Sequence, residues 1–359
     1  MTRPWGLRKR AVLLPAEWVA LAAAACLAAA LTALPNLHGV FDIFWKSALM
    51  TATAFGEGAL AVILVSTALA WLKAHSQAKS ASMGRQLRSS SLADIGMWTD
   101  FLRLASALWI VLTAYFLVKT SIHILNPRVF DAWLWRSDQW LGLGHDPKLM
   151  ALHMFAWPPL LHALDVVYSV VYPLLFTFTP PLLALLSPTR ALRVGALTGF
   201  CLLWVLGGAL YVAFPSWGPV YTRPAQFEAA LQSMPITVYV QTELFQELKG
   251  VIQRPAGPRP VRFGGVAAFP SLHLAVIILF TLAVWRISRW WFWLSLAISA
   301  AMLAGSLVTG YHYLMDSLAG IVLGATCYVV ALAWADRWLD PEPRENVGKA
   351  SPGDARAPR

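Results

Sequence analysis

Apolar runs of about 20 residues recur along the chain, and they restrict its possible folds more than any other feature. Of the 359 residues, 58% are hydrophobic and only 13% are charged. A soluble chain of this length needs more polar surface to cover its core. Runs of this length match the hydrocarbon layer of a bilayer, which a helix of about 20 residues crosses. The sequence therefore predicts an all-α integral membrane protein.

The runs predict about eight transmembrane helices in three parts. Residues 1–100 form a two-span extension with a basic loop, residues 101–338 form a six-helix core with a long loop at 215–270, and residues 339–359 form a disordered tail. Segment 128–147 alternates charged and aromatic residues, which predicts a helix lying on the membrane surface. The expected spans are at about 18–34, 48–71, 104–125, 160–186, 194–214, 271–285, 291–309 and 313–335.

The basic residues predict how the chain crosses the membrane, because cytoplasmic loops are rich in Lys and Arg. The basic residues concentrate in alternate loops. Lys46 and Lys119 are mild exceptions, and long loops such as 215–270 do not count in this rule. We therefore expect a multi-pass protein of the cell membrane with both termini in the cytoplasm. No basic soluble domain accompanies the net charge of +10, so nucleic acid is not an expected partner. The basic loops are the N-terminus, 73–97, 187–193, 286–289 and the tail.

Two short polar patches, 269–273 and 310–316, flank a pair of expected spans joined by 286–289. If both spans cross the bilayer, the chain goes in and returns, so the patches meet on one face. The count of spans puts that face outside the cytoplasm. The sequence thus predicts that His273 and His312 lie together on the extracytoplasmic side of the bundle.

The residue types in these patches are suited to nucleophilic or acid–base chemistry. His312 and Asp316 are four apart, so they share a helical face. A carboxylate bonded to one imidazole nitrogen fixes the tautomer and leaves the other nitrogen free to attack. His273 begins a helix, where free N–H groups favour an anion such as phosphate, and Ser271 is placed to cap that helix or to donate to a phosphate oxygen.

Other readings of the polar residues stay open. Two His and one Asp also allow a zinc site, although the usual His-Glu-x-x-His spacing is absent. Glu57 and Asp165 lie within expected spans, where acidic residues are costly unless they face the bundle. They allow a non-catalytic lipid transporter or scaffold, or only hydrogen bonds between helices. Tyr168 and Tyr172 share a helical face with Asp165, as the lining of a polar cavity would.

The two patches resemble motifs of the type 2 phosphatidic acid phosphatase superfamily, and most closely its inositol phosphorylceramide synthase-like branch. The resemblance covers about residues 104–336 and implies that fold's core of six helices. It implies that His312 is a nucleophile that forms a phosphohistidine, that Asp316 orients it, and that His273 protonates the leaving group, with no metal or other cofactor. The matching residues are Phe269-Pro270-Ser271-Leu272-His273 and Thr309-Gly310-Tyr311-His312-Tyr313-x-x-Asp316-x-x-Ala319-Gly320.

The chain departs from the phosphatases at their phosphate-binding arginines. Gly305-Ser306 stands in place of a Ser-Arg pair, and Lys249-x4-Arg254-Pro255 does not have the spacing of the Lys-x6-Arg-Pro motif. Arg223, Arg259 and Arg262, in the long loop, are the residues nominated instead. The expected function is transfer of a phosphorylated headgroup to a lipid alcohol, and hydrolysis of a lipid phosphate is the alternative. The expected partners are membrane lipids.

Overall fold

The computed structural model describes residues 13–31, short helical stretches between 44 and 68, residues 95–254 and residues 265–339. The described residues form helices and turns and include no β-strand. The long helices are α1 (Pro15–Leu31), α4 (Ile95–Lys119), α8 (Pro158–Val166), which continues through a π-helical turn (Val167–Val171) into α9 (Tyr172–Leu186), α10 (Arg190–Ala213), α14 (Leu272–Trp285), α15 (Arg289–Val308) and α16 (Leu314–Leu339).

Five helical stretches are long and apolar enough to cross a membrane: α4, α8 with α9, α10, α15 and α16. Three further apolar helical stretches, 15–29, 56–65 and α14, are shorter. The expected all-α, multi-pass membrane class is confirmed. The number of eight spans stays a prediction, as does the orientation.

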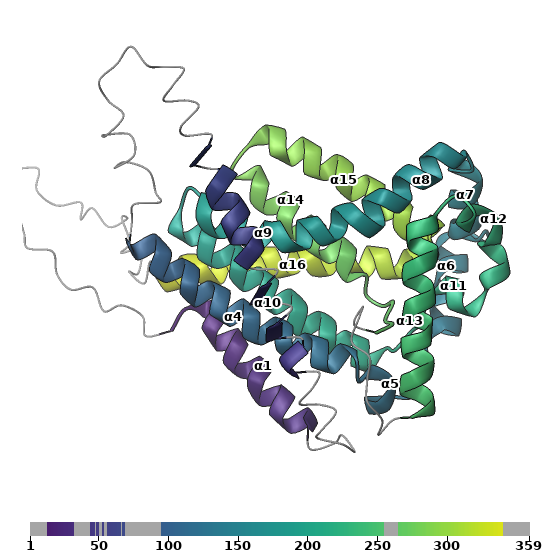
Figure 1. Cartoon of the computed structure of the whole chain (residues 1–359), viewed down its shortest axis with the longest axis horizontal. Coiled ribbons are helices and arrows are strands. Elements are labelled where there is room, and N and C mark those ends of the chain that lie inside the picture. Colours follow the sequence, from purple (N-terminus) through teal and green to yellow (C-terminus); the bar gives the residue numbers. More distant parts are fainter. Residues whose placement is uncertain are drawn as a thin grey trace, which may run out of the picture.

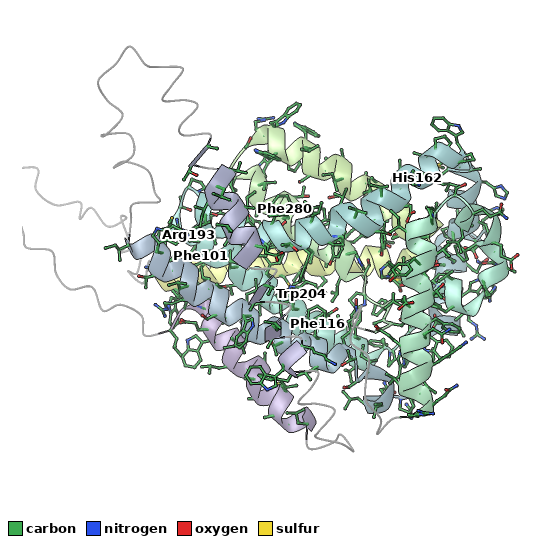
Figure 2. All side chains as sticks on the ribbon, in the orientation of Figure 1. Phe101, Phe116, His162, Arg193, Trp204 and Phe280 are labelled. Carbon is green, nitrogen blue, oxygen red and sulfur yellow. The ribbon has the colours of Figure 1, made fainter. Side chains whose placement is uncertain are left out.

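Helix α10 lies at the centre of the bundle and packs against α1, α4, α14 and α16 (Figure 1). Its buried face is almost entirely apolar. Figure 2 shows Phe101, Phe116, Trp204 and Phe280 distributed among these helices, and it places Arg193 and His162 towards opposite ends of the molecule. Burial of such side chains between helices holds the long bundle together by close packing.

Glycines bring α16 against α14. A Cβ at Gly320 would clash with the carbonyl oxygen of Ser271, and one at Gly324 would clash with that of Ala275. Small residues let helix backbones approach closely inside membranes. Because Gly320 faces the start of α14, this approach sets the first turns of α14 and α16 side by side.

Several short helices and the 19-residue helix α13 gather at one end of the bundle, and we call them the cap (Figure 1). The expected surface helix within 128–147 is α6, which buries Leu134 and Asp138 and leaves Trp133 and Trp140 exposed. The long loop at 215–270 is partly helical. The cap consists of α6 (Asp131–Leu141), α7 (Pro147–Met154), α11 (Pro219–Thr222), a 3₁₀ turn (Pro224–Gln226), α12 (Glu228–Leu231) and α13 (Pro235–Gln253), and α5 (Ile122–Leu125) lies beside it.

Asp165 ties the bundle to the cap. Its buried carboxylate accepts hydrogen bonds from the N–H groups of Ile236 and Thr237, 3.0 and 2.8 Å away, at the start of α13. A carboxylate there caps orphan donors and interacts favourably with the helix dipole. The sequence left open whether Asp165 has a functional role or forms only structural hydrogen bonds. These contacts support the structural role. Glu57 is exposed on the stretch 56–65.

Candidate active site

Helices α14 and α16 begin beside one another and bring the two predicted histidines together. The ring centroids of His273 and His312 lie 5.7 Å apart, with an angle of 66° between the rings. The N–H of Ser271 donates to the carbonyl oxygen of Asp316 over 2.9 Å, which ties the two helix starts. This separation lets one phosphate group contact both rings.

Ser271 begins α14 as its N-cap. Its hydroxyl accepts from the N–H of Leu274 at 3.5 Å, and the residue is completely buried. Of the two roles expected for Ser271, capping is the one that the contacts support. His273 follows within the first turn and is partly exposed, whereas His312 is buried at 2% exposure.

The hydrogen bonds of His312 define which of its nitrogens can react. Nδ1 lies 2.9 Å from the carbonyl oxygen of Ala268 and 3.5 Å from Oδ2 of Asp316. A carbonyl oxygen only accepts, so Nδ1 carries the proton in the neutral ring. Nε2 then keeps its lone pair, which is the state a nucleophile needs.

Asp316 has two contacts that keep it in place. Its Oδ2 accepts from the N–H of Tyr313 at 2.8 Å, one turn before, and also faces Nδ1 of His312. The carboxylate is completely buried. This side chain therefore caps its own helix while it faces the imidazole, so helix capping and ring orientation are coupled.

The strap, residues 265–269, carries the carbonyl group that binds His312, and hydrogen bonds hold it along its length. The N–H of Ala268 donates to the carbonyl oxygen of Ser216 at 3.1 Å, and the N–H of Phe269 donates to its hydroxyl at 2.9 Å. His123 contacts the carbonyl oxygen of Val266 through Nε2 at 3.2 Å. Burial lowers the pKa of His123, so its ring is kept neutral.

Helix α6 holds the turn that carries His312 in place through hydrogen bonds. Asp138 accepts from the N–H groups of Leu314 and Met315, both at 2.9 Å, and therefore satisfies orphan donors of α16. Asp131 accepts from the hydroxyl of Tyr313 at 3.1 Å and from two N–H groups at residues 217–218. Burial raises the pKa of Asp131.

A cavity of about 250 Å³ opens beside the two imidazoles. Its lining is mostly aromatic and apolar. Among the described residues that line it, Lys119 at the end of α4 is the one lysine, arginine or acidic residue. Tyr168 and Tyr172 line it around His273, with ring centroids 4.8 and 4.1 Å from the imidazole. The lining residues are Lys119, Tyr168, Ser169, Tyr172, Pro173, Trp217, Tyr221, Val240, Leu244, Gly265, Val266, Ala267, His273, Tyr311 and His312.

Lys119 was missed by the sequence reasoning, which treated it only as an exception to the charge rule. A signal for it exists. Lys119-x6-Asn126-Pro127 has the spacing of the Lys-x6-Arg-Pro motif, with Asn where the motif has Arg. The amide of Asn126 donates to the carbonyl oxygen of Val212 at 2.8 Å, so this position serves the packing of α5 rather than the cavity.

None of the three arginines that the sequence analysis expected to bind phosphate is among the described residues that line the cavity. Arg223 does not line the cavity, and its guanidinium lies over the ring of Trp135, 3.9 Å from the centroid. Arg259 and Arg262 lie outside the described residues. Across the described ranges, no group of three or more His, Cys, Asp or Glu side chains could hold a metal ion.

Comparison with models of known protein families identifies the family of this chain. A model of the PAP2 superfamily matches residues 132–330, which is more than half of the chain. The chain belongs to the PAP2 superfamily. The match includes His273, His312 and Asp316 and begins after Lys119. No curated protein and no solved structure matches the chain. PAP2 enzymes are lipid phosphatases or phosphotransferases, so membership supports an enzyme of this kind and leaves the branch open.

Proposed function

We propose that this PAP2 protein is a membrane lipid phosphotransferase that works through a covalent phosphohistidine at His312. The observation that supports it most is the bond from Nδ1 of His312 to Ala268, which leaves Nε2 free in the cavity that His273 and Lys119 also line. The donor is a lipid phosphate ester and the acceptor a lipid alcohol. The reaction needs no metal in this proposal.

The first half of the reaction forms a bond between Nε2 of His312 and phosphorus. The bond from phosphorus to the leaving oxygen breaks, and that oxygen takes a proton from His273, which acts as general acid. Lys119 balances the negative charge of the phosphate. Asp316 stabilises the positive charge that develops on the His312 ring, as the carboxylate of a catalytic triad does.

The second half reverses these roles. The acceptor hydroxyl gives its proton to His273 as its oxygen attacks phosphorus. The bond from phosphorus to Nε2 then breaks, and its electron pair returns to the His312 ring. Water in place of the alcohol would give hydrolysis through the same intermediate. A transporter without chemistry receives less support, because Glu57 is exposed and Asp165 is used in capping α13.

The site is proposed to face the extracytoplasmic side of the cell membrane. In support, the basic residues Arg190 and Arg193 begin α10 at the end of the bundle away from the cap, as Figure 2 shows for Arg193 against His162. Basic residues at that end match the charge rule for cytoplasmic loops.

Trapping the intermediate tests the proposal. The purified full-length chain in detergent is mixed with a phospholipid labelled at phosphorus, quenched, digested and searched for labelled histidine. We expect label on His312, its loss in His312→Ala, and its retention in His162→Ala, a matched exposed histidine outside the cavity. Label on another residue, or none, would refute the mechanism.

The acceptor separates transfer from hydrolysis. Turnover of the labelled phospholipid is measured with and without a lipid alcohol in the micelle. A transferase releases product in proportion to the alcohol. Equal release in its absence would show that water is the acceptor and that the chain is a phosphatase.

A further inference from the structure

Four buried polar atoms that have no hydrogen-bond partner belong to residues of the same cavity. They are the hydroxyls of Tyr168 and Tyr311, Nε1 of Trp217 and Nδ1 of His273, and none of them has a partner among the described residues. Buried polar groups nearly always have a partner, because an unsatisfied one costs about 1–3 kcal/mol. Their concentration at one cavity points to a ligand that supplies the partners.

These groups define the chemistry of that ligand. The indole N–H of Trp217 and the ammonium of Lys119 only donate hydrogen bonds. Burial raises the pKa of Tyr311 well above its ordinary value, so its hydroxyl keeps its proton and can also donate. A lining of donors complements a group whose exposed atoms are acceptors, as the non-bridging oxygens of a phosphate ester are.

The charges around the cavity favour a ligand of low charge. Lys119 from α4 is the one lysine or arginine among the described residues of the lining, and the carboxylate of Asp316 on α16 lies behind the ring of His312. Glu247 on α13 is buried, accepts from the N–H of Gly265 and acts electrostatically on Lys119. The tyrosines of the lining are neutral donors and add no charge. The described surroundings therefore balance at most one negative charge.

Phosphate esters differ in charge. A phosphodiester carries one negative charge, whereas a phosphomonoester carries about −1.5 to −2 at pH 7 because its second pKa is about 6. An uncompensated buried charge is costly, whereas neutral donors satisfy oxygens without adding charge. The second charge of a monoester has no counterpart among the described groups.

We propose that the cavity selects a phosphodiester lipid over a phosphomonoester, with Lys119 as the cation and with Tyr168, Tyr311 and Trp217 as neutral donors to the phosphate oxygens. This inference rests on the proposed function, since it assumes that the phosphate of the substrate lies beside His312. In this proposal, neutral hydrogen-bond donors contact the phosphate where a second cation would be needed to balance a phosphomonoester dianion.

Binding to a matched pair of lipids tests the inference. The probes are short-chain phosphatidic acid, a monoester, and phosphatidylmethanol with the same acyl chains, a diester. Binding is measured by calorimetry on full-length His312→Asn in detergent, so that neither lipid is consumed. At about pH 7.5 we expect the diester to bind about tenfold more tightly, and at about pH 5, where the monoester carries one charge, we expect that gap to close.

The neutral donors are tested by removing one polar atom each. Tyr168→Phe, Tyr311→Phe and Trp217→Phe keep the aromatic ring, and each is expected to weaken diester binding about tenfold, as for one hydrogen bond to a charged acceptor. Tyr328→Phe and Trp338→Phe are matched controls outside the lining and should bind as the parent does. Arg259→Ala with Arg262→Ala should leave the preference for the diester unchanged.

The possible outcomes separate this inference from the proposed function. Tighter binding of the monoester at about pH 7.5, unchanged binding in all three donor variants, or binding of neither lipid would overturn it. If the wild-type chain forms a phosphohistidine at His312 but prefers the monoester, the inference alone fails. If no phosphohistidine forms with either lipid, the proposed function fails, while the binding comparison still decides the specificity.

Discussion

His312 donates from Nδ1 to the carbonyl oxygen of Ala268 over 2.9 Å, a shorter distance than the 3.5 Å to its expected partner Asp316. The main chain therefore fixes the tautomer of the ring, and Asp316 adds charge. In triad enzymes the carboxylate also fixes the tautomer, and its loss costs about 10⁴ in rate. Here part of that function is supplied by the backbone.

We expect Asp316→Asn to lower kcat by about 10²-fold, because the asparagine oxygen can still accept from Tyr313 while the charge beside the ring is lost. His312→Ala should lower it by several orders of magnitude more. Steady-state kinetics with a phospholipid donor and an alcohol acceptor measure both. Equal losses in the two variants would contradict a tautomer held by Ala268.

Lys119 is expected to bind the phosphate of the substrate. Lys119→Met should lower kcat/KM about 10–100-fold, the effect of one charge-assisted hydrogen bond, and Lys119→Arg should restore part of it. Lys249→Met is the control, since that ammonium lies over the ring of Phe245 and does not line the cavity. The idea is wrong if the two methionine variants have the same kcat/KM.

The sequence was informative where short-range spacing decides the outcome. Asp316 faces His312, as their spacing of four residues predicts, although His312 lies in the turn before α16 and not on the same helix. His273 lies beside them because α14 and α15 run out and back. Lys119 was overlooked because its motif ends in Asn126 instead of Arg. Spacing predicts contacts between residues that are close in sequence, and the out-and-back path of the chain predicts that the two imidazoles meet.

Contacts between distant elements were beyond sequence reasoning. Asp138 accepts a hydrogen bond from the N–H group of Leu314, 176 positions later in the sequence, and no local sequence pattern predicts that contact. Asp165 left two readings open because its partners, Ile236 and Thr237, belong to a helix in the long loop. Hydrogen bonds of this kind depend on how the cap folds back on the bundle, which only the tertiary structure defines.

Gly320 should be essential to the approach of the two histidines. Gly320→Ala places a methyl group against the carbonyl oxygen of Ser271, so α14 and α16 must separate, and we expect a lower unfolding temperature together with lower kcat. Gly250→Ala is the matched control, because a Cβ there meets no atom within 4 Å and alanine favours the helix. A Gly320→Ala variant as stable and active as the control would show that the helix spacing does not position the site.

The free energy of unfolding should depend on the buried ion pairs that Lys148 forms. Its ammonium lies 2.9 Å from Asp138 and 2.8 Å from Asp146, and Lys148 and Asp138 have fully buried side chains. Lys148→Met leaves two carboxylates without their cation, so we expect a loss of about 3–5 kcal/mol in the free energy of unfolding. Adding Asp138→Asn and Asp146→Asn should recover much of it, which denaturant titration in detergent can measure. No recovery would mean that packing around Lys148, and not its charge, accounts for the loss.

His123 should make the strap sensitive to acid. Burial lowers its pKa below the ordinary value of 6.5, so the unfolded chain binds a proton at this residue more readily than the folded chain does. The stability from the neutral ring is therefore fully present above pH 6.5 and is lost as the pH falls through the lowered pKa of the folded state. His123→Gln keeps a donor for the carbonyl oxygen of Val266 but does not titrate, so its unfolding temperature should fall less between about pH 7 and pH 5. His162→Gln, at an exposed position, should follow the wild-type curve, and a His123→Gln curve parallel to wild type would show that this ring is not kept neutral by burial.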